Sequence, residues 1–129
     1  MKRTKGQASI EFFILFIVIL SLLAVFLFFS TEIQNVVMYL TKYQQSSSVA
    51  FRVASAASAA VETEGIQIRQ NIPVGFSIMA QPAAIFVTEK NTNTSASWPL
   101  PNVIVNCSVS ENATSLNITF VNQTLYIIG

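Results

Sequence analysis

The sequence contains neither histidine nor aspartate, and it has one cysteine among its 129 residues. These absences remove most metal sites, which are built from His, Cys, Asp and Glu side chains, and most nucleophile–base pairs. A lone cysteine also excludes a disulfide within the chain, so we expect Cys107 to be a small buried apolar side chain. The four glycines are scattered and form no phosphate-binding loop. We therefore expect a protein that is not an enzyme and that holds no cofactor or metal.

Charge is scarce as well, because only 10% of the residues are charged whereas soluble domains average about 25%. Apolar residues make up 52% of the chain, and the excess lies between Ile10 and Phe29. Residues 12–29 contain no charge and a single hydroxyl, that of Ser21. A run of about 18 to 20 apolar residues is long enough to cross a bilayer as a helix. We therefore expect a membrane-spanning helix in this segment.

Three basic residues precede the apolar run, at Lys2, Arg3 and Lys5. A basic patch can bind nucleic acid, but cations beside a membrane-length segment are better interpreted as a topology signal. They favour an amino terminus in the cytoplasm and a carboxyl terminus outside, with no nucleic-acid partner. A secretory signal peptide fits less well, because its apolar core is only about 7 to 15 residues long and is followed by a small-x-small cleavage site. Residues 28–31 provide no such site.

Glu11 lies at the edge of the apolar run, between Ile10 and Phe12. A carboxylate in a transmembrane helix costs about 2.5 to 3.5 kcal/mol at the bilayer centre and less near the interface. One interpretation is that Glu11 only marks the interface of a plain membrane anchor. The other is that it is a functional group that pairs with a positive charge. Its position alone does not separate the two.

The residues that lead to Glu11 read Gly6-Gln7-Ala8-Ser9-Ile10-Glu11, directly after the basic residues. This combination resembles the class III signal peptide of archaeal type IV pilin-like proteins. In that family a short basic leader ends in a small residue, and Gln-x-Ser-x-Glu opens the mature hydrophobic helix. Bacterial pseudopilins of the tight-adherence type show a similar Glu-Phe, but the Gln-x-Ser element favours the archaeal family. The resemblance covers the leader and the apolar run, and nothing beyond them is diagnostic.

The resemblance implies that a prepilin peptidase cuts between Gly6 and Gln7, so that residues 1–6 form a leader that is removed on maturation. It also implies that Glu11 neutralises the new α-amine of Gln7 on a neighbouring subunit of a filament. Leaving half of such a pair in a dry core costs roughly 3 to 5 kcal/mol. An amino-terminal glutamine can also cyclise, which would remove this positive charge, and the sequence leaves that point open.

Neither glycine nor proline, the strongest helix breakers, occurs between Gln7 and Glu64. We therefore expect one long helix over residues 7–64, with Gly65 as its left-handed carboxyl cap. Residues 49–61 are rich in alanine, and small side chains let other elements approach closely. We expect this part to pack on the head domain of the same chain. The polar stretch 43–48 is a place where the helix could bend or melt.

After Gly65, short alternating runs separated by turn residues predict a small antiparallel β head over residues 65–129 and hence an α+β fold. The predicted strands are 66–70, 74–80, 84–88, 103–109, 115–121 and 124–128. Residues 91–101 are rich in Asn, Ser, Thr and Pro and predict a loop. The last two strands predict a tight hairpin at Asn122-Gln123. About 65 residues form only a marginal core, so we expect the head to dock on the helix.

Five Asn-x-Ser/Thr patterns lie in the head, and each is an acceptor pattern for N-linked glycosylation. They begin at Asn93, Asn106, Asn112, Asn117 and Asn122. Side chains alternate across a strand, and the immediate neighbours of Asn106 and Asn117 are apolar, so both asparagines should face solvent. The other three fall in loops or turns. We expect N-linked glycans on at least two of the five; the alternative is a polar surface that serves only solubility.

These features favour a structural subunit of an extracellular type IV pilus-like filament, used for adhesion or surface attachment. The expected partners are copies of the same chain, the prepilin peptidase, the pilus assembly platform and, before assembly, the cytoplasmic membrane. One alternative is a monomeric surface protein anchored by the same helix. Another is a minor pilin that primes or caps a filament made mainly by another protein. The processing motif does not separate a major from a minor pilin.

Overall fold

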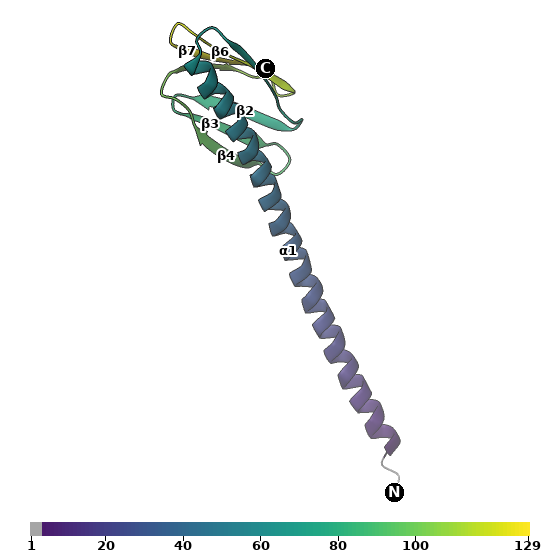
Figure 1. The fold of residues 1–129 in the computed structure, drawn as a ribbon. Helices are drawn as coiled ribbons and strands as arrows, with labels where there is room; N and C mark the ends of the chain where they lie inside the picture. The colour runs from purple at the N-terminus through teal and green to yellow at the C-terminus, as the bar shows by residue number, and fades with distance from the viewer. Residues whose placement is uncertain (1–3) are drawn as a thin grey trace. The chain divides into compact units, whose positions relative to one another are not determined.

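The computed structural model describes residues 4–129, with side chains from Ser9 onward. Over these residues the chain forms one α-helix followed by seven β-strands (Figure 1). The helix α1 runs from Thr4 to Glu62. The chain divides into two compact units, one ending at Met38 and the other comprising Tyr39–Gly129. A long apolar helix followed by a small β domain gives the α+β fold that the sequence predicts.

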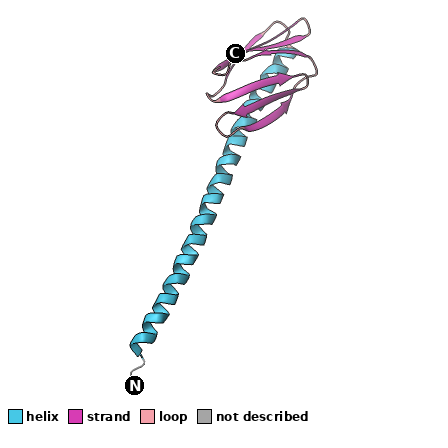
Figure 2. Cartoon of the chain, turned by 180° about the vertical axis from the view of Figure 1, so that it is seen from behind, coloured by secondary structure: helices cyan, strands magenta, loops and turns pink. Residues whose placement is uncertain are grey.

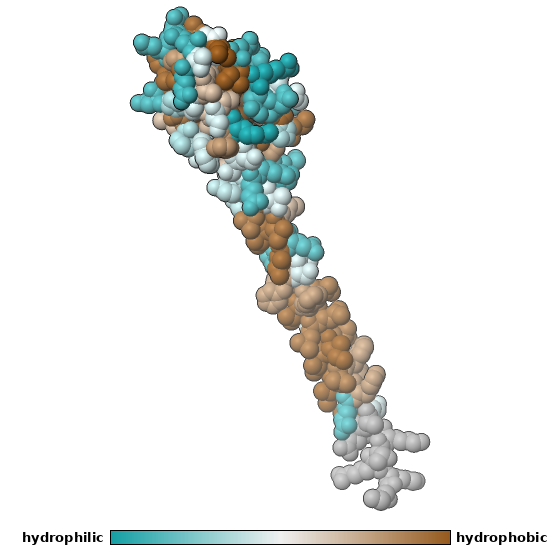
Figure 3. All heavy atoms as spheres, in the orientation of Figure 1, coloured by the Kyte–Doolittle hydropathy of each residue, from teal (hydrophilic) through white to brown (hydrophobic). Residues whose placement is uncertain are grey.

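The first unit is the apolar part of α1. The large apolar side chains from Ile10 to Phe29 are each 48–70% exposed. Hydrophobic residues cover the visible face of this part of the helix (Figure 3). The one hydroxyl within the run, that of Ser21, donates a hydrogen bond of 2.8 Å to the carbonyl oxygen of Ile17. Polar groups in hydrocarbon need partners within the protein, so this bond suits a helix surrounded by lipid.

The second unit contains the rest of α1, which buries one stripe of side chains against the strands. The buried helix residues recur at spacings of three and four and are Ser46, Val49, Ala50, Val53, Ala54, Ala57 and Ala60. Two opposite views show this part of α1 lying across one side of the sheets (Figures 1 and 2). The expected packing of the Ala-rich segment on its own head domain is therefore confirmed.

The seven strands form two sheets. They are β1 (Gln67–Asn71), β2 (Phe76–Gln81), β3 (Ala84–Glu89), β4 (Thr94–Pro99), β5 (Ile104–Ser108), β6 (Ser115–Val121) and β7 (Thr124–Ile128). One sheet has the order β1-β6-β7-β5 and the other the order β2-β3-β4, and β2 lies next to β5 where the two sheets adjoin. Together with α1 they enclose one apolar core.

Two predictions about the head are wrong. Residues 91–101 are not all loop, because β4 pairs along its whole length with β3. Its sequence hides the strand, since the inward Thr94 and Ala96 are polar or small, although both are buried. It ends on Pro99, which an edge strand tolerates. The second wrong prediction is that the head is entirely antiparallel. Strands β5 and β7 pair in parallel, whereas the other strand pairs are antiparallel as predicted.

The carboxyl end of α1 lies close to the predicted position, and the helix begins earlier than predicted, at Thr4 rather than residue 7. It ends at Glu62 rather than at residue 64, and Gly65 has the expected positive φ of 85°. The backbone N–H of Gly65 donates to the carbonyl oxygen of Phe120 at 3.0 Å. The glycine therefore turns the chain and also ties the end of α1 to β6.

The hairpin between β6 and β7 is confirmed at Asn122-Gln123. Both residues have positive φ values, 50° and 63°, as a two-residue type I′ turn requires. The backbone N–H of Asn122 donates to Glu64 Oε1 at 3.1 Å, so this turn is held by the segment that follows α1. The polar stretch 43–48 of α1 stays helical, and within it buried Ser46 donates to the carbonyl oxygen of Thr94 at 3.2 Å.

Candidate assembly and modification sites

The residues of the predicted processing motif lie at the beginning of α1. Gly6 and Gln7 belong to the helix, but their side chains lie outside the described ones, so cleavage between them stays a prediction. Glu11 is exposed on the helix surface, among exposed apolar side chains. The next acidic residue along α1 is Glu32, which lies beyond the apolar run. Glu11 is therefore the carboxylate that marks the start of the apolar surface.

The apolar part of α1 has the length and composition of a membrane span. Among the described residues, one helix segment, Ser9–Glu62, meets these criteria, and its most apolar 18-residue window has a mean hydropathy of 3.3. None of that window is buried within the chain. A surface this apolar and this exposed is compatible with anchoring in a membrane.

The five asparagines of the Asn-x-Ser/Thr patterns are all exposed. Asn106 lies in β5 and Asn117 in β6, and both face away from the core, as the alternation of their strands predicts. Asn93 lies in the turn between β3 and β4, and Asn112 in the segment between β5 and β6. Asn122 lies in the turn of the β6–β7 hairpin. An attached sugar would thus point to solvent at each position, while glycosylation itself stays a prediction.

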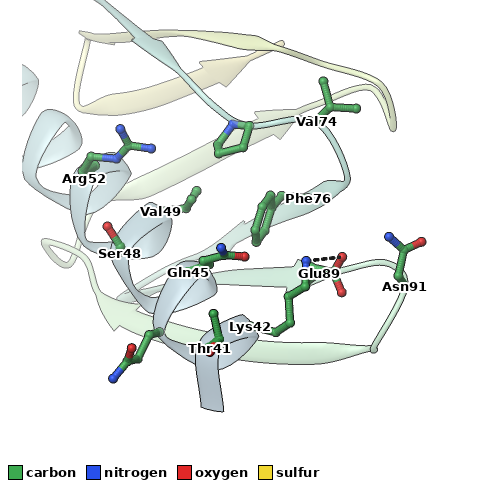
Figure 4. Close-up of a pocket in the computed structure, with 12 residues that line it drawn as sticks. Thr41, Lys42, Gln45, Ser48, Val49, Arg52, Val74, Phe76, Glu89 and Asn91 are labelled. Atoms are coloured by element: carbon green, nitrogen blue, oxygen red, sulfur yellow. Dashed lines mark ion pairs between the residues drawn. The ribbon is translucent and has the colours of Figure 1, made fainter. Parts of the chain in front are cut away.

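A groove of about 510 Å³ lies between α1 and the strands of the second unit, and no local sequence pattern predicts it. Lys42, Gln45 and Arg52 line it from the helix, and Val74 and Asn91 lie across from them (Figure 4). Its lining is mixed, with two cationic side chains among amides, hydroxyls and apolar groups.

Glu89 lies at one side of this groove and is only 3% exposed. Its Oε1 lies 3.7 Å from Lys42 Nζ. Its Oε2 accepts hydrogen bonds from the backbone N–H and the hydroxyl of Thr92, at 2.8 and 2.7 Å. The bonds from Thr92, more than the charge of Lys42, hold the pKa of the Glu89 carboxyl below its usual value of 4.5. Strand alternation would have found this residue, because Ile85, Val87 and Glu89 share the inward face of β3.

The hydroxyl network continues into β4. Thr92 Oγ1 lies 2.8 Å from Thr94 Oγ1, and since the single hydrogen of the Thr92 hydroxyl is donated to Glu89, Thr94 must be the donor in this pair. The Thr94 carbonyl oxygen in turn accepts the hydrogen bond from Ser46 of α1. The network thus joins the helix to the turn between β3 and β4. Its role is therefore structural.

Cys107 is half-buried in β5, next to the other sheet, and burial raises the pKa of its thiol. A raised pKa disfavours the reactive thiolate, which agrees with a packing role for this side chain. Among residues whose side chains are described, no group of three or more Cys and Glu residues is arranged to hold a metal ion. Comparison with family models, curated proteins and solved structures finds no match for this chain.

Proposed function

We propose that this chain is a structural subunit of an archaeal type IV pilus-like extracellular filament that serves adhesion or surface attachment. The proposal rests on one observation. Glu11, in the sequence Gly6-Gln7-Ala8-Ser9-Ile10-Glu11, stands at the start of a helix whose apolar side chains are exposed from Ile10 to Phe29. A basic leader, a small residue and Gln-x-Ser-x-Glu before such a helix form the pattern that the archaeal family shares.

The exposed apolar surface explains why such a chain would assemble. Each buried Leu, Ile or Phe contributes about 1.5 to 3 kcal/mol relative to exposure to water, so this helix belongs either in lipid or against other helices. Lipid tails are as apolar as Leu, so packing and polar pairs decide which helices associate inside the membrane. A polar group near the helix start can therefore select the partner and its register.

Glu11 supplies that polar group in the proposed filament. Cleavage between Gly6 and Gln7 would create an α-amine at Gln7, and the Glu11 carboxylate of one subunit would neutralise the amine of its neighbour. Pairing at this position favours subunits that are in register, because a half-made pair in a dry core costs roughly 3 to 5 kcal/mol. The β head, with its five exposed glycosylation patterns, would then cover the outside of the filament.

The test is the substitution Glu11→Ala, compared with Glu32→Ala. Both changes remove a glutamate from α1, but Glu32 lies beyond the apolar run. We expect Glu11→Ala to abolish or strongly reduce the filaments that can be sheared from cells, while the processed chain still accumulates in the membrane. Glu32→Ala should assemble normally. Electron microscopy of the sheared fraction and the mass of the membrane-bound chain give the two readouts.

The outcomes separate the proposal from its alternatives. Normal filaments from the Glu11→Ala variant would refute the pairing. A wild-type chain that keeps its leader and stays in the membrane would instead favour the monomeric anchored protein. Filaments composed mainly of another protein, with this chain present in small amounts, would identify a minor pilin.

A further inference from the structure

The outer face of the four-stranded sheet carries exposed apolar side chains. On its inner face, Leu116, Ile118, Leu125 and Ile127 are fully buried. On the opposite face lie four side chains that we call the apolar outer face: Ile104, Val121, Tyr126 and Ile128. Ile104 is 66% exposed and Ile128 is 51% exposed. Apolar groups that gather on one exposed face can mark a surface that another group covers.

Two of the five asparagines lie on this same face, beside these apolar residues. Asn117 of β6 pairs in register with Ile128 of β7. Asn106 of β5 pairs in register with Tyr126 of β7. Neighbouring strands are about 4.8 Å apart, so the two asparagines flank the outward side chains of β7 from its two sides. Asn93, Asn112 and Asn122 lie in turns or connecting segments instead.

We propose that sugars attached to Asn106 and Asn117 cover the apolar outer face of the four-stranded sheet. This inference rests on the part of the proposed function that places a glycosylated head outside the cell. It goes further in assigning a purpose to two of the five positions. The occupant of the apolar face is thus a glycan on the same chain, and not a second copy of the sheet.

The attachment needs an activated glycosyl donor, by chemical class a lipid-phosphate-linked oligosaccharide. The amide nitrogen Nδ2 of each asparagine forms a bond to the anomeric carbon of the sugar. The bond from that carbon to the phosphate oxygen breaks, the lipid phosphate leaves with the electron pair, and a base accepts the amide proton. No oxidation or reduction takes place.

The test removes individual acceptor patterns while keeping every asparagine. Ser108→Ala removes the pattern at Asn106, and Thr119→Ala removes that at Asn117. The matched control pair is Ser95→Ala with Thr114→Ala, which removes the patterns at Asn93 and Asn112. The full-length chains are purified from the source cells in detergent, so that the cell's own machinery attaches the sugar and filament assembly is not required.

Glycopeptide mass spectrometry then reports occupancy, and light scattering during heating reports association. We expect sugar on Asn106 and Asn117 of the wild-type chain. In the Ser108→Ala/Thr119→Ala variant, association should begin at a lower temperature than in the wild-type chain, because the apolar outer face is then uncovered. The control pair should behave like the wild type. Adding Ile104→Gln and Ile128→Gln to the sensitive variant, changes that create no new acceptor pattern, should restore the wild-type onset.

Several results would overturn the inference. Wild-type peptides that carry Asn106 and Asn117 without sugar would do so, and so would equal effects of the two variant pairs. Failure of the glutamine substitutions to restore the onset would show that the apolar face is not what the sugars cover. These readouts are independent of assembly, so a chain that forms no filaments but shows the expected difference would refute the pilin proposal and keep this one.

Discussion

Glu89 is a buried carboxylate whose contacts join α1 to the turn between β3 and β4. Its two oxygens contact Lys42 on α1 and Thr92 in the turn that follows β3. Because these contacts favour the charged form, the pKa of Glu89 is lower in the folded chain than in the unfolded chain. The resulting stabilisation is present above the unfolded pKa and is lost as the pH falls through the folded pKa.

We therefore predict that Glu89→Gln lowers the unfolding temperature at neutral pH. The amide is neutral, and the hydrogen bonds from Thr92 to it are weaker than those to a carboxylate. The difference between wild type and variant should shrink as the pH falls below the usual carboxyl pKa of 4.5, because the wild-type side chain is then increasingly protonated as well. Thermal unfolding from pH 7 down to pH 3 measures this difference.

The matched control is Glu62→Gln, at the exposed carboxyl end of α1. It should shift the unfolding temperature little, because exposed charges contribute little to stability. A Glu89 difference that stays constant down to pH 3 would contradict the assigned role of its charge.

Residues that need a particular backbone conformation, such as a positive φ, were predictable from the sequence. Buried polar side chains that depend on distant hydrogen-bond partners were not. Gly65 takes the positive φ expected of a helix-ending glycine, and Asn122 takes that of a hairpin turn. Strand alternation places Glu89 on the inward face of β3, but its partners come from the helix and from the next turn, so no local pattern reveals its contacts. The exposed positions of Asn106 and Asn117 followed from the two-residue alternation of strands.

At the scale of elements, the Ala stripe of α1 sets how closely the helix lies against the sheets. Ala57 is fully buried, whereas Ala59, two residues later, is exposed. We predict that Ala57→Leu destabilises the head by about 1 to 3 kcal/mol, because the added methyl and methylene groups have no room. Ala59→Leu, the same change on the exposed side, should be nearly neutral. Chemical denaturation of both variants gives the free energies, and equal effects would contradict the packing described.

The strands show where local patterns fail. β6 and β7 have the predicted bounds, because large apolar residues alternate along both and a turn joins them. β4 was missed because its buried positions hold Thr94 and Ala96, which are polar or small, and the contacts of Thr94 with Thr92 and with Ser46 of α1 are not visible in the local sequence. The parallel pairing of β5 with β7 also depends on tertiary arrangement, since the sequence of a short strand does not fix the direction of its partner.

At the scale of the whole molecule, the two units differ in what stabilises them. The core residues of the chain lie between Val49 and Ile127, all within the unit Tyr39–Gly129. We predict that a fragment of residues 39–129 folds cooperatively in water without detergent. Circular dichroism and thermal unfolding of that fragment provide the check. A fragment that stays unfolded or needs detergent would show that the apolar part of α1 contributes to the stability of the head.

The apolar part of α1 has no comparable core, and this contrast underlies the proposed assembly. Its large side chains are exposed from Ile10 to Phe29, so lipid or neighbouring helices must cover them. The sequence predicted this helix and its carboxyl end well, because a long apolar run without glycine or proline can form few structures other than a helix. The order of subunits in a filament depends on contacts between copies, which one sequence does not specify.

The most direct test of the pilin proposal is the mass of the amino-terminal peptide from filaments sheared off the cells. We predict a chain that begins at Gln7, either as the free amine or in its cyclised form, and that is recovered outside the membrane. A chain that begins at Met1 and occurs only in the membrane fraction would contradict the proposal and favour a monomeric anchored protein.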